Sequence, residues 1–279
     1  MRMARNSCGW REIVADSGIL SPTFWNIIVK NSGDGMEQYF QENGNDVFIL
    51  FSLTHQLTLA SFILFMVLIF LFRKQLRTLW INRTFRIGLA VTLIISEISL
   101  HWWLWHIDAW EIKHSLPLHL SSISLLLSAV LLVTKSYRLF EFTFFAGVGS
   151  ALQAMITPDI SSYTFPHFRY VHFFISHGGI VIANIFIVFV EGFKPTAKSV
   201  WKAFLYLNLY TCIVFLLNFF LEGNYMYISQ KPVNPSLLDY LGPWPYYLIP
   251  LELITLATFW LLYLPFWLYQ IYAKVHHQV

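Results

Sequence analysis

Long runs of apolar residues recur along the chain after about residue 45, and short polar connections separate them. Seven of these runs approach the roughly 20 residues that an α-helix needs to cross the hydrocarbon core of a bilayer. They cover residues 47–72, 85–105, 116–134, 140–156, 170–191, 201–221 and 246–269, and the fourth is the shortest. None has the period-two alternation of a barrel strand, and backbone polar groups in lipid must be satisfied internally. The pattern therefore predicts an all-α bundle of seven transmembrane helices.

Composition supports a polytopic membrane protein. The 279 residues are 57% hydrophobic and 18% aromatic, and only 12% are charged. This is far too apolar for a soluble domain. The net charge of +3 does not indicate a nucleic-acid partner, because the basic residues flank the predicted helices and form no separate basic domain.

The positions of lysine and arginine predict the topology. Eleven of these residues fall in alternate connections, on one predicted side: Arg73, Lys74, Arg77, Arg83, Arg86, Lys135, Arg138, Lys194, Lys198, Lys202 and Lys274. The opposite connections hold only Lys113, Arg169 and Lys231. The positive-inside rule then places the amino terminus outside and the carboxy terminus in the cytoplasm.

Three regions are expected along the chain. Residues 1–44 form an amino-terminal extension, residues 45–272 the membrane domain, and residues 273–279 a cytoplasmic tail. The segment N-S-G-D-G directly before Met36 is compatible with a purine-rich run upstream of a start codon, so we hypothesise that translation begins at Met36. Cys8 and Cys212 are too few for a disulfide framework, and Cys212 reads as a small packing residue within a helix.

Polar side chains within the apolar runs are the candidates for function, because an ionisable group there costs on the order of 2.5–3.5 kcal/mol on insertion scales. They are His55, Glu97, His101, His119, Ser121, His172, His177, Asn184, Asn218, Glu222 and Glu252. Nearly all lie in the predicted outer halves of their helices, whereas the cytoplasmic halves look like ordinary apolar packing. We expect these residues to converge on one outward-facing cavity. The alternative is that they form hydrogen bonds between helices and hold the bundle together.

The segment S-L-P-L-H-L-S-S, residues 115–122, is unusually polar for the start of an apolar run. Pro117 is expected in the first helical turn, where its missing N–H costs nothing. If Ser121 is a nucleophile, its base must come from another helix. A rise of 1.5 Å per residue puts Ser121 about 7 Å deep and His177 about 10 Å deep, so the two can meet. From the pattern alone, a serine at this position is more often a small packing residue than a nucleophile.

Several motifs resemble a known family. They are L-P-L-H-L-S (116–121), T-P-D (157–159), H-G-G (177–179), V-E-G-F-K-P-T (190–196), E-G-N-Y-M-Y-I-S-Q-K-P (222–232) and L-L-D-Y-L-G-P-W-P-Y-Y (237–247). With them the chain resembles the YwaF family of bacterial seven-helix membrane proteins, which is similar to the eukaryotic transmembrane protein 164 family. The latter is implicated in phospholipid acyl transfer and is thought to use a cysteine and a histidine.

Carried onto this sequence, the resemblance places that cysteine at Ser121 and that histidine at His177. It implies a phospholipid acyltransferase in a bacterial cell membrane, with a phospholipid or lysophospholipid as partner and no cofactor. The serine is a departure, because a hydroxyl depends more completely on its base than a thiol does. His119, Asn218 or a backbone N–H are candidates to stabilise an oxyanion, and Glu97 or Glu222 are candidates to orient a histidine.

Two further function classes remain open from the sequence. A metal-dependent lipid hydrolase would bind Zn²⁺ through histidines such as His101, His119, His172 and His177, although the last helix carries none. A transporter or lipid receptor would use the same cavity without making or breaking bonds, although the two halves show no paired interrupted helices. The sequence does not indicate the lipid head group, the acceptor or the oligomeric state.

Overall fold

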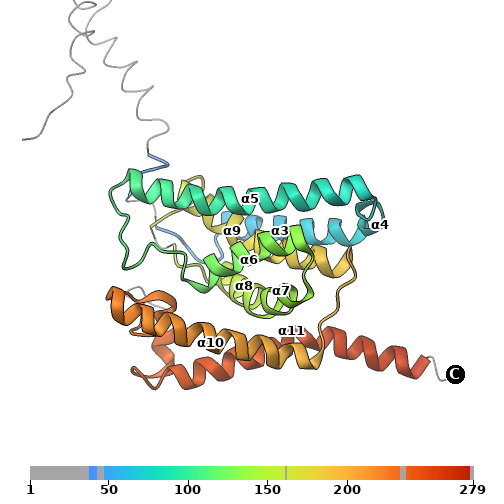
Figure 1. Ribbon diagram of the computed structural model, residues 1–279. Coiled ribbons are helices and arrows are strands. Elements are labelled where there is room, and N and C mark those ends of the chain that lie inside the picture. The colour runs from blue at the N-terminus through green and yellow to red at the C-terminus, as the bar shows by residue number, and fades with distance from the viewer. Residues whose placement is uncertain (1–37, 43–46, 161, 233–236, 277–279) are drawn as a thin grey trace, which may run out of the picture.

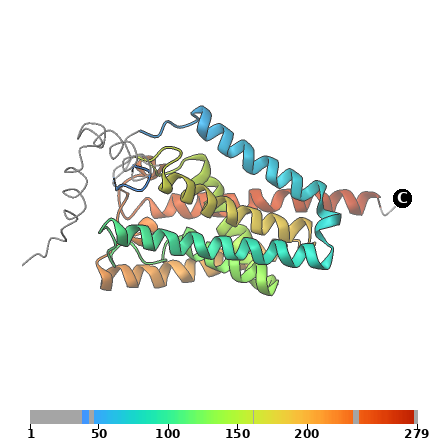
Figure 2. The same ribbon diagram turned by 90° about the horizontal axis from the view of Figure 1, so that it is seen from above.

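The computed structural model describes residues 38–42, 47–160, 162–232 and 237–276. Within them it contains helices and no strand, which confirms the predicted all-α class. The long helices run roughly along a common direction in both views (Figures 1 and 2). The hypothesis of a start at Met36 concerns residues outside the described ranges and stays a prediction.

Six helical segments are long and apolar enough to span a bilayer. They are α3 (Leu53–Leu71), α5 (Leu79–His106), the composite segment Tyr137–Ile156, α9 (Phe168–Phe189), α10 (Ala197–Leu221) and α11 (Leu248–His276). The seventh apolar helix, α6 (Leu120–Thr134), has 15 residues. The sequence predicts the fourth segment as the shortest, but in the structure the third segment, α6, is the shortest. Short helices α4 (Arg73–Leu76), η2 (Tyr225–Tyr227) and η3 (Leu237–Leu241) lie between the spans, and α11 continues into the predicted tail.

The fourth span is longer than its apolar run because a π-helical segment joins two short α-helices. It consists of α7 (Tyr137–Phe142), η1 (Thr143–Gly147) and α8 (Val148–Ile156). Within η1 the Thr143 hydroxyl donates a hydrogen bond of 2.8 Å to the Asn184 side chain of α9. π-Helical turns are rare and occur mostly as single-turn bulges, frequently at functional sites. Here the bulge directly precedes helix α8 in the chain.

Helix α9 is the central element of the bundle. In its most apolar 18-residue stretch, 78% of the residues are buried. The corresponding share is 11% for α3 and for α11, which lie at the periphery. Helices α3, α5, α6 and α8 all pack against α9. Helices α10 and α11 form a pair on one side of the bundle (Figure 1), where they pack against α7, η1 and α8.

Two adjacent glycines allow the close packing around α9. A Cβ atom at Gly179 would lie 2.5 Å from Leu93 of α5, and one at Gly178 would lie 2.0 Å from the Phe62 ring of α3. Both distances are below van der Waals contact, so larger residues there would push the helices apart. The H-G-G motif thus combines His177 with two close helix contacts.

The end of the bundle that carries Arg86, Lys135 and Lys202, here called the basic end, holds one buried and one partly buried acidic residue. Glu191 accepts hydrogen bonds from Lys135 at 2.8 Å and Asn82 at 2.7 Å. Glu141 is buried and accepts from Ser199 at 2.7 Å and from Lys202 at 3.1 Å. The expectation that the halves at this end contain only ordinary apolar packing was therefore wrong, because carboxylates near helix ends pair there with basic side chains.

Candidate functional site

A cavity of about 1150 Å³ lies between the α10–α11 pair and helices α6, α8 and α9. Ser121 at the start of α6 and His177 of α9 both line it, as do His119 and Glu252. These four are the sequence-predicted site residues that the structure brings together. One end of the cavity, here called the mouth, is lined by Asp159, Tyr227 and Asp239.

The segment before α6 is not helical, contrary to the expectation for Pro117. Helix α6 begins at Leu120, and His119 is its N-cap residue. The chain before it is tied to other elements, because the Leu116 N–H donates to the Tyr225 hydroxyl at 2.9 Å and the Tyr210 hydroxyl donates to the Leu118 carbonyl at 2.9 Å. Non-helical backbone at membrane depth is tolerated where protein groups satisfy it. The late helix start places Ser121 in the first turn.

Ser121 occupies the second position of α6 and is half-buried. The first N–H groups of a helix have no partner within the helix, and His119 makes no side-chain capping hydrogen bond to them. Among the described residues, no hydrogen bond of the Ser121 hydroxyl is found. Ser121 thus combines a hydroxyl available to a partner with the positive end of a helix dipole.

The tautomer of His177 is fixed by its surroundings. Its Nδ1 lies 2.8 Å from the Phe173 carbonyl oxygen, and its ring packs on that of Phe173 with centroids 4.2 Å apart. A carbonyl oxygen only accepts hydrogen bonds, so Nδ1 carries the proton and Nε2 of the neutral ring is an acceptor. A backbone carbonyl thus orients this imidazole, whereas Glu97 lies beside His101 and Glu222 pairs with Lys113.

His119 has the opposite arrangement. Its Nδ1 accepts a hydrogen bond of 3.3 Å from the Met226 backbone N–H, so the proton of the neutral ring lies on Nε2. The rings of Tyr225 and Tyr227 pack around it, with centroid distances of 5.3 and 5.7 Å. The cavity therefore has one histidine whose free nitrogen accepts a proton and one whose free nitrogen donates a hydrogen bond.

Other lining residues had no place in the sequence-based site. Asp159 belongs to the T-P-D motif and Tyr227 to E-G-N-Y-M-Y, so each was within a recognised motif but not singled out. Burial raises the pKa of Tyr227, as does the nearby Asp159, whereas Arg169 lowers it. The phenol therefore stays protonated at neutral pH and can donate a hydrogen bond at the mouth. Glu252 is held by the Asn208 amide at 3.1 Å.

Seven predicted residues lie away from this cavity: His55, Glu97, His101, His172, Asn184, Asn218 and Glu222. Most of them hold helices or loops together, as the alternative reading proposed. His55 bonds the Met155 carbonyl through Nε2 at 2.9 Å. The Asn218 side chain accepts from the Tyr225 N–H at 2.8 Å and donates to the Tyr225 carbonyl at 3.0 Å, so it holds this loop and does not line the cavity. Asn184 is engaged with Thr143.

The remaining residues of this set form separate polar contacts. Glu97 Oε1 lies 3.6 Å from His101 Nε2 on the same helix. His172 bonds Ser176 at 3.2 Å within α9. Glu222 pairs at 2.6 Å with Lys113, and both side chains are largely exposed. The single convergent cavity predicted for all of them was wrong, because sequence spacing fixes a helix face but not the neighbour that this face meets.

Metal chemistry finds no support in the arrangement of the histidines. The described ranges contain no group of three or more histidine, cysteine or acidic side chains that could hold a metal ion. Cys212 was expected to be a packing residue, but it is exposed and lines the large cavity. Its thiol is therefore a second candidate nucleophile in the cavity that Ser121 lines.

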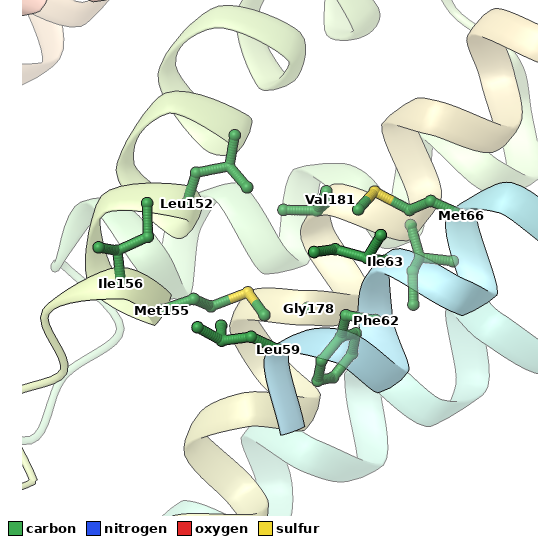
Figure 3. Close-up of a pocket in the computed structure, with 10 residues that line it drawn as sticks. Leu59, Phe62, Ile63, Met66, Leu152, Met155, Ile156, Gly178 and Val181 are labelled. Atoms are coloured by element: carbon green, nitrogen blue, oxygen red, sulfur yellow. The ribbon is translucent and has the colours of Figure 1, made fainter. Parts of the chain in front are cut away.

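A second cavity of about 170 Å³ lies on the other side of α8. It is lined by apolar side chains of α3, α8 and α9 together with Gly178 (Figure 3). In that view Leu59, Phe62 and Met66 of α3 lie near Met155 and Val181. Without polar groups, this cavity offers no chemistry and leaves the larger one as the candidate site.

A family model described as the TMEM164 family matches residues 50–263. The comparison with curated proteins and the comparison with solved structures gave no match. The family match covers most of the chain and includes every motif that carried the sequence resemblance. Together with the apolar helices, it shows that this chain is a multi-pass membrane protein that belongs to the TMEM164 family.

Proposed function

We propose that the protein transfers an acyl group from a membrane phospholipid to a lysophospholipid or to water, with Ser121 as nucleophile and His177 as general base. The observation that carries this proposal is that Ser121 and His177, on different helices, line one cavity of about 1150 Å³. A serine hydroxyl needs a positioned base within hydrogen-bond reach to become nucleophilic. Such contacts are often looser without substrate, which fits a Ser121 hydroxyl that has no hydrogen bond among the described residues.

The reaction has two balanced halves. Ser121 Oγ attacks the ester carbonyl carbon while His177 Nε2 takes the hydroxyl proton. The ester C–O bond then breaks, and the leaving lysophospholipid alcohol takes that proton from His177, which leaves an acyl ester on Ser121. In the second half the acceptor hydroxyl gives its proton to His177 and attacks the acyl ester, and the proton returns to Ser121.

Two features near Ser121 support stabilisation of the negative charge that develops on the carbonyl oxygen. The first-turn N–H groups of α6 point along the helix axis beyond its N-terminus, where the dipole favours negative charge. His119 Nε2–H is a second donor in the same cavity. These donors replace the Asn218 amide, which is occupied by Tyr225.

The lining of the cavity also fits an amphipathic substrate. Polar residues gather at the mouth with Asp159, Tyr227 and Asp239, and apolar ones such as Leu207 and Phe259 line the opposite end. A phospholipid has the same distribution, with a polar head group and hydrocarbon tails. Cavities that bind small molecules typically combine apolar walls with a few convergent polar groups.

Labelling with an alkyl fluorophosphonate, which modifies activated serines, tests the proposal. We expect covalent labelling of the purified protein, no labelling of Ser121→Ala, and at least about a hundredfold slower labelling of His177→Ala, because the base is lost. Ser150→Ala is the matched control, since Ser150 lines the same cavity but its hydroxyl is bonded to the Ala146 carbonyl at 2.7 Å.

Unchanged labelling of Ser121→Ala would contradict the assignment of the nucleophile. An unlabelled wild-type protein that still binds phospholipid would instead favour the lipid receptor or transporter, which uses the cavity without chemistry.

A further inference from the structure

We infer that the closed inner end of the large cavity measures the length of the acyl chain, with Phe259 as the residue that stops the chain. This inference rests on the proposed function, because it assumes that a lipid acyl chain occupies the cavity. It adds a selectivity for chain length that neither the motif resemblance nor the proposed chemistry supplies.

The direction of the cavity follows from the helices that line it. Lining residues of α11 run from Leu248, near the mouth, to Phe259, which is roughly 16 Å further along the helix. On the antiparallel α10 they run from Leu216 inward to Leu207. The polar residues of the mouth thus lie at one end of a long space, and Leu207 and Phe259 lie together at the other end.

The inner end is a packed wall. Ala146, Leu207 and Phe259 line the cavity and also belong to a buried apolar cluster that fills the basic end of the bundle. Phe259 is 2% exposed and packs against Phe145 with ring centroids 5.5 Å apart. A hydrocarbon chain that enters from the mouth therefore meets a closely packed aromatic surface, and an extra methylene would have to displace it.

A glycine sets the width of the cavity near this wall. Gly149 of α8 lines the cavity, and a Cβ atom there would make an ordinary contact of 3.4 Å with Thr258. A Cβ atom at this position fits between α8 and α11 and would lie 3.9 Å from the Phe259 ring. Substitution of Gly149 is thus a way to reduce the space beside Phe259.

The occupant is a hydrocarbon chain because of the chemistry of the wall and its surroundings. The inner lining around Phe259 offers no charged side chain, and the hydroxyls of Ser150 and Thr258 beside it donate to backbone carbonyls of their own helices. Leu216 and Ile254, which line the cavity farther out, also have exposed apolar side chains. The walls between the mouth and Phe259 therefore offer apolar surface to a hydrocarbon chain.

Competitive binding of lysophosphatidylcholines tests the inference without requiring catalysis. Purified Ser121→Ala protein is incubated with an equimolar series from decanoyl to stearoyl chains, and the bound species are quantified by native mass spectrometry. We expect Phe259→Ala, combined with Ser121→Ala, to favour longer chains by roughly tenfold or more, because each methylene in a fitted pocket discriminates on that scale. Gly149→Val should favour shorter chains.

Phe259→Leu provides a milder variant with the same expected direction if the alanine variant does not fold. The matched control is Phe219→Ala, which removes an equally large ring from the lipid-exposed face of α10 outside the cavity. An unchanged chain-length profile in both Phe259→Leu and Gly149→Val would overturn the inference.

This result is independent of the proposed chemistry. If chain-length preference shifts in a protein that no fluorophosphonate labels, Phe259 limits the length of the bound chain but the proposed acyl transfer is wrong. If Ser121 is labelled and no shift occurs, the acyl transfer is supported and the role of Phe259 is wrong.

Discussion

The two ends of the bundle use buried polar groups in opposite ways. At the basic end, Glu191 and Glu141 each have basic and neutral partners at distances of 2.7 to 3.2 Å. At the cavity end, the Ser121 hydroxyl has no hydrogen bond among the described residues, and His177 has its Nε2 free of such a bond. Both ends lie in one helical scaffold and differ in how completely their polar atoms are paired.

This difference in pairing indicates which polar groups stabilise the fold and which are available for function. A buried charge with all its partners in place fixes the helices relative to one another, and its loss leaves the partners unpaired. A polar group that faces a cavity without a protein partner contributes little to folding and is available to a ligand. We therefore expect substitutions at the basic end to lower stability and substitutions at the cavity end to abolish chemistry.

Replacement of Glu191 by alanine should produce the largest loss of stability. It removes the carboxylate that pairs with Lys135 and lies 3.8 Å from Arg86. We expect about 3 kcal/mol, at the lower end of the range for a buried ion pair, because the Lys135 side chain is partly exposed. Unfolding in detergent micelles measures the change, and fluorophosphonate labelling per folded molecule should not change. A loss no greater than that of Glu111→Ala, whose pair with His114 is exposed, would contradict the account.

Gly179→Ala should have the next largest effect, because it crowds the contact between α9 and α5. The new methyl group would lie 2.5 Å from a terminal methyl group of the fully buried Leu93, which must shift within the core. We expect a loss of about 2 kcal/mol of unfolding free energy from overpacking. Gly88→Ala is the matched control on a helix, since nothing lies within 4 Å of its Cβ position. Equal melting temperatures for the two variants would show that the close approach at Gly179 is not required.

Glu222→Gln should have the smallest effect, although Glu222 lies at the cavity end. The hydrogen bond and charge of Lys113 lower the pKa of Glu222, and those of Glu222 raise the pKa of Lys113. The contribution of the pair is thus present above the usual pKa of a glutamate and is lost as pH falls through the lowered value. Both side chains are exposed, so salt screens the pair. We expect a barely measurable change at neutral pH that vanishes in acid, as unfolding at several pH values would show.

The sequence predicts helices well here, because apolar runs of bilayer length have few alternatives. It predicts less about the composite fourth span, whose π-helical turn depends on packing against Asn184 and not on a local signal. The start of α6 was misplaced for a similar reason. Pro117 is compatible with a first turn, but the hydrogen bonds with Tyr210 and Tyr225 hold this segment in a non-helical turn up to His119.

The candidate site was predictable only in part. Ser121, His177, His119 and Glu252 line the same cavity, because they lie on or beside helices that pack around one space. Glu97 and His101 share a face of α5, but that face lies away from the cavity. Residues of connecting loops, such as Asp159 and Tyr227, could not be placed from helical periodicity.

Mapping of the acyl group after incubation with phospholipid tests the central claim most directly. Rapid quenching followed by peptide mass spectrometry locates any acyl ester or thioester on the chain. The account predicts an acyl ester on Ser121, which disappears in Ser121→Ala and forms far more slowly in His177→Ala. Acyl transfer that proceeds with the label on Cys212, the thiol in the same cavity, or with no label on the protein, would contradict it.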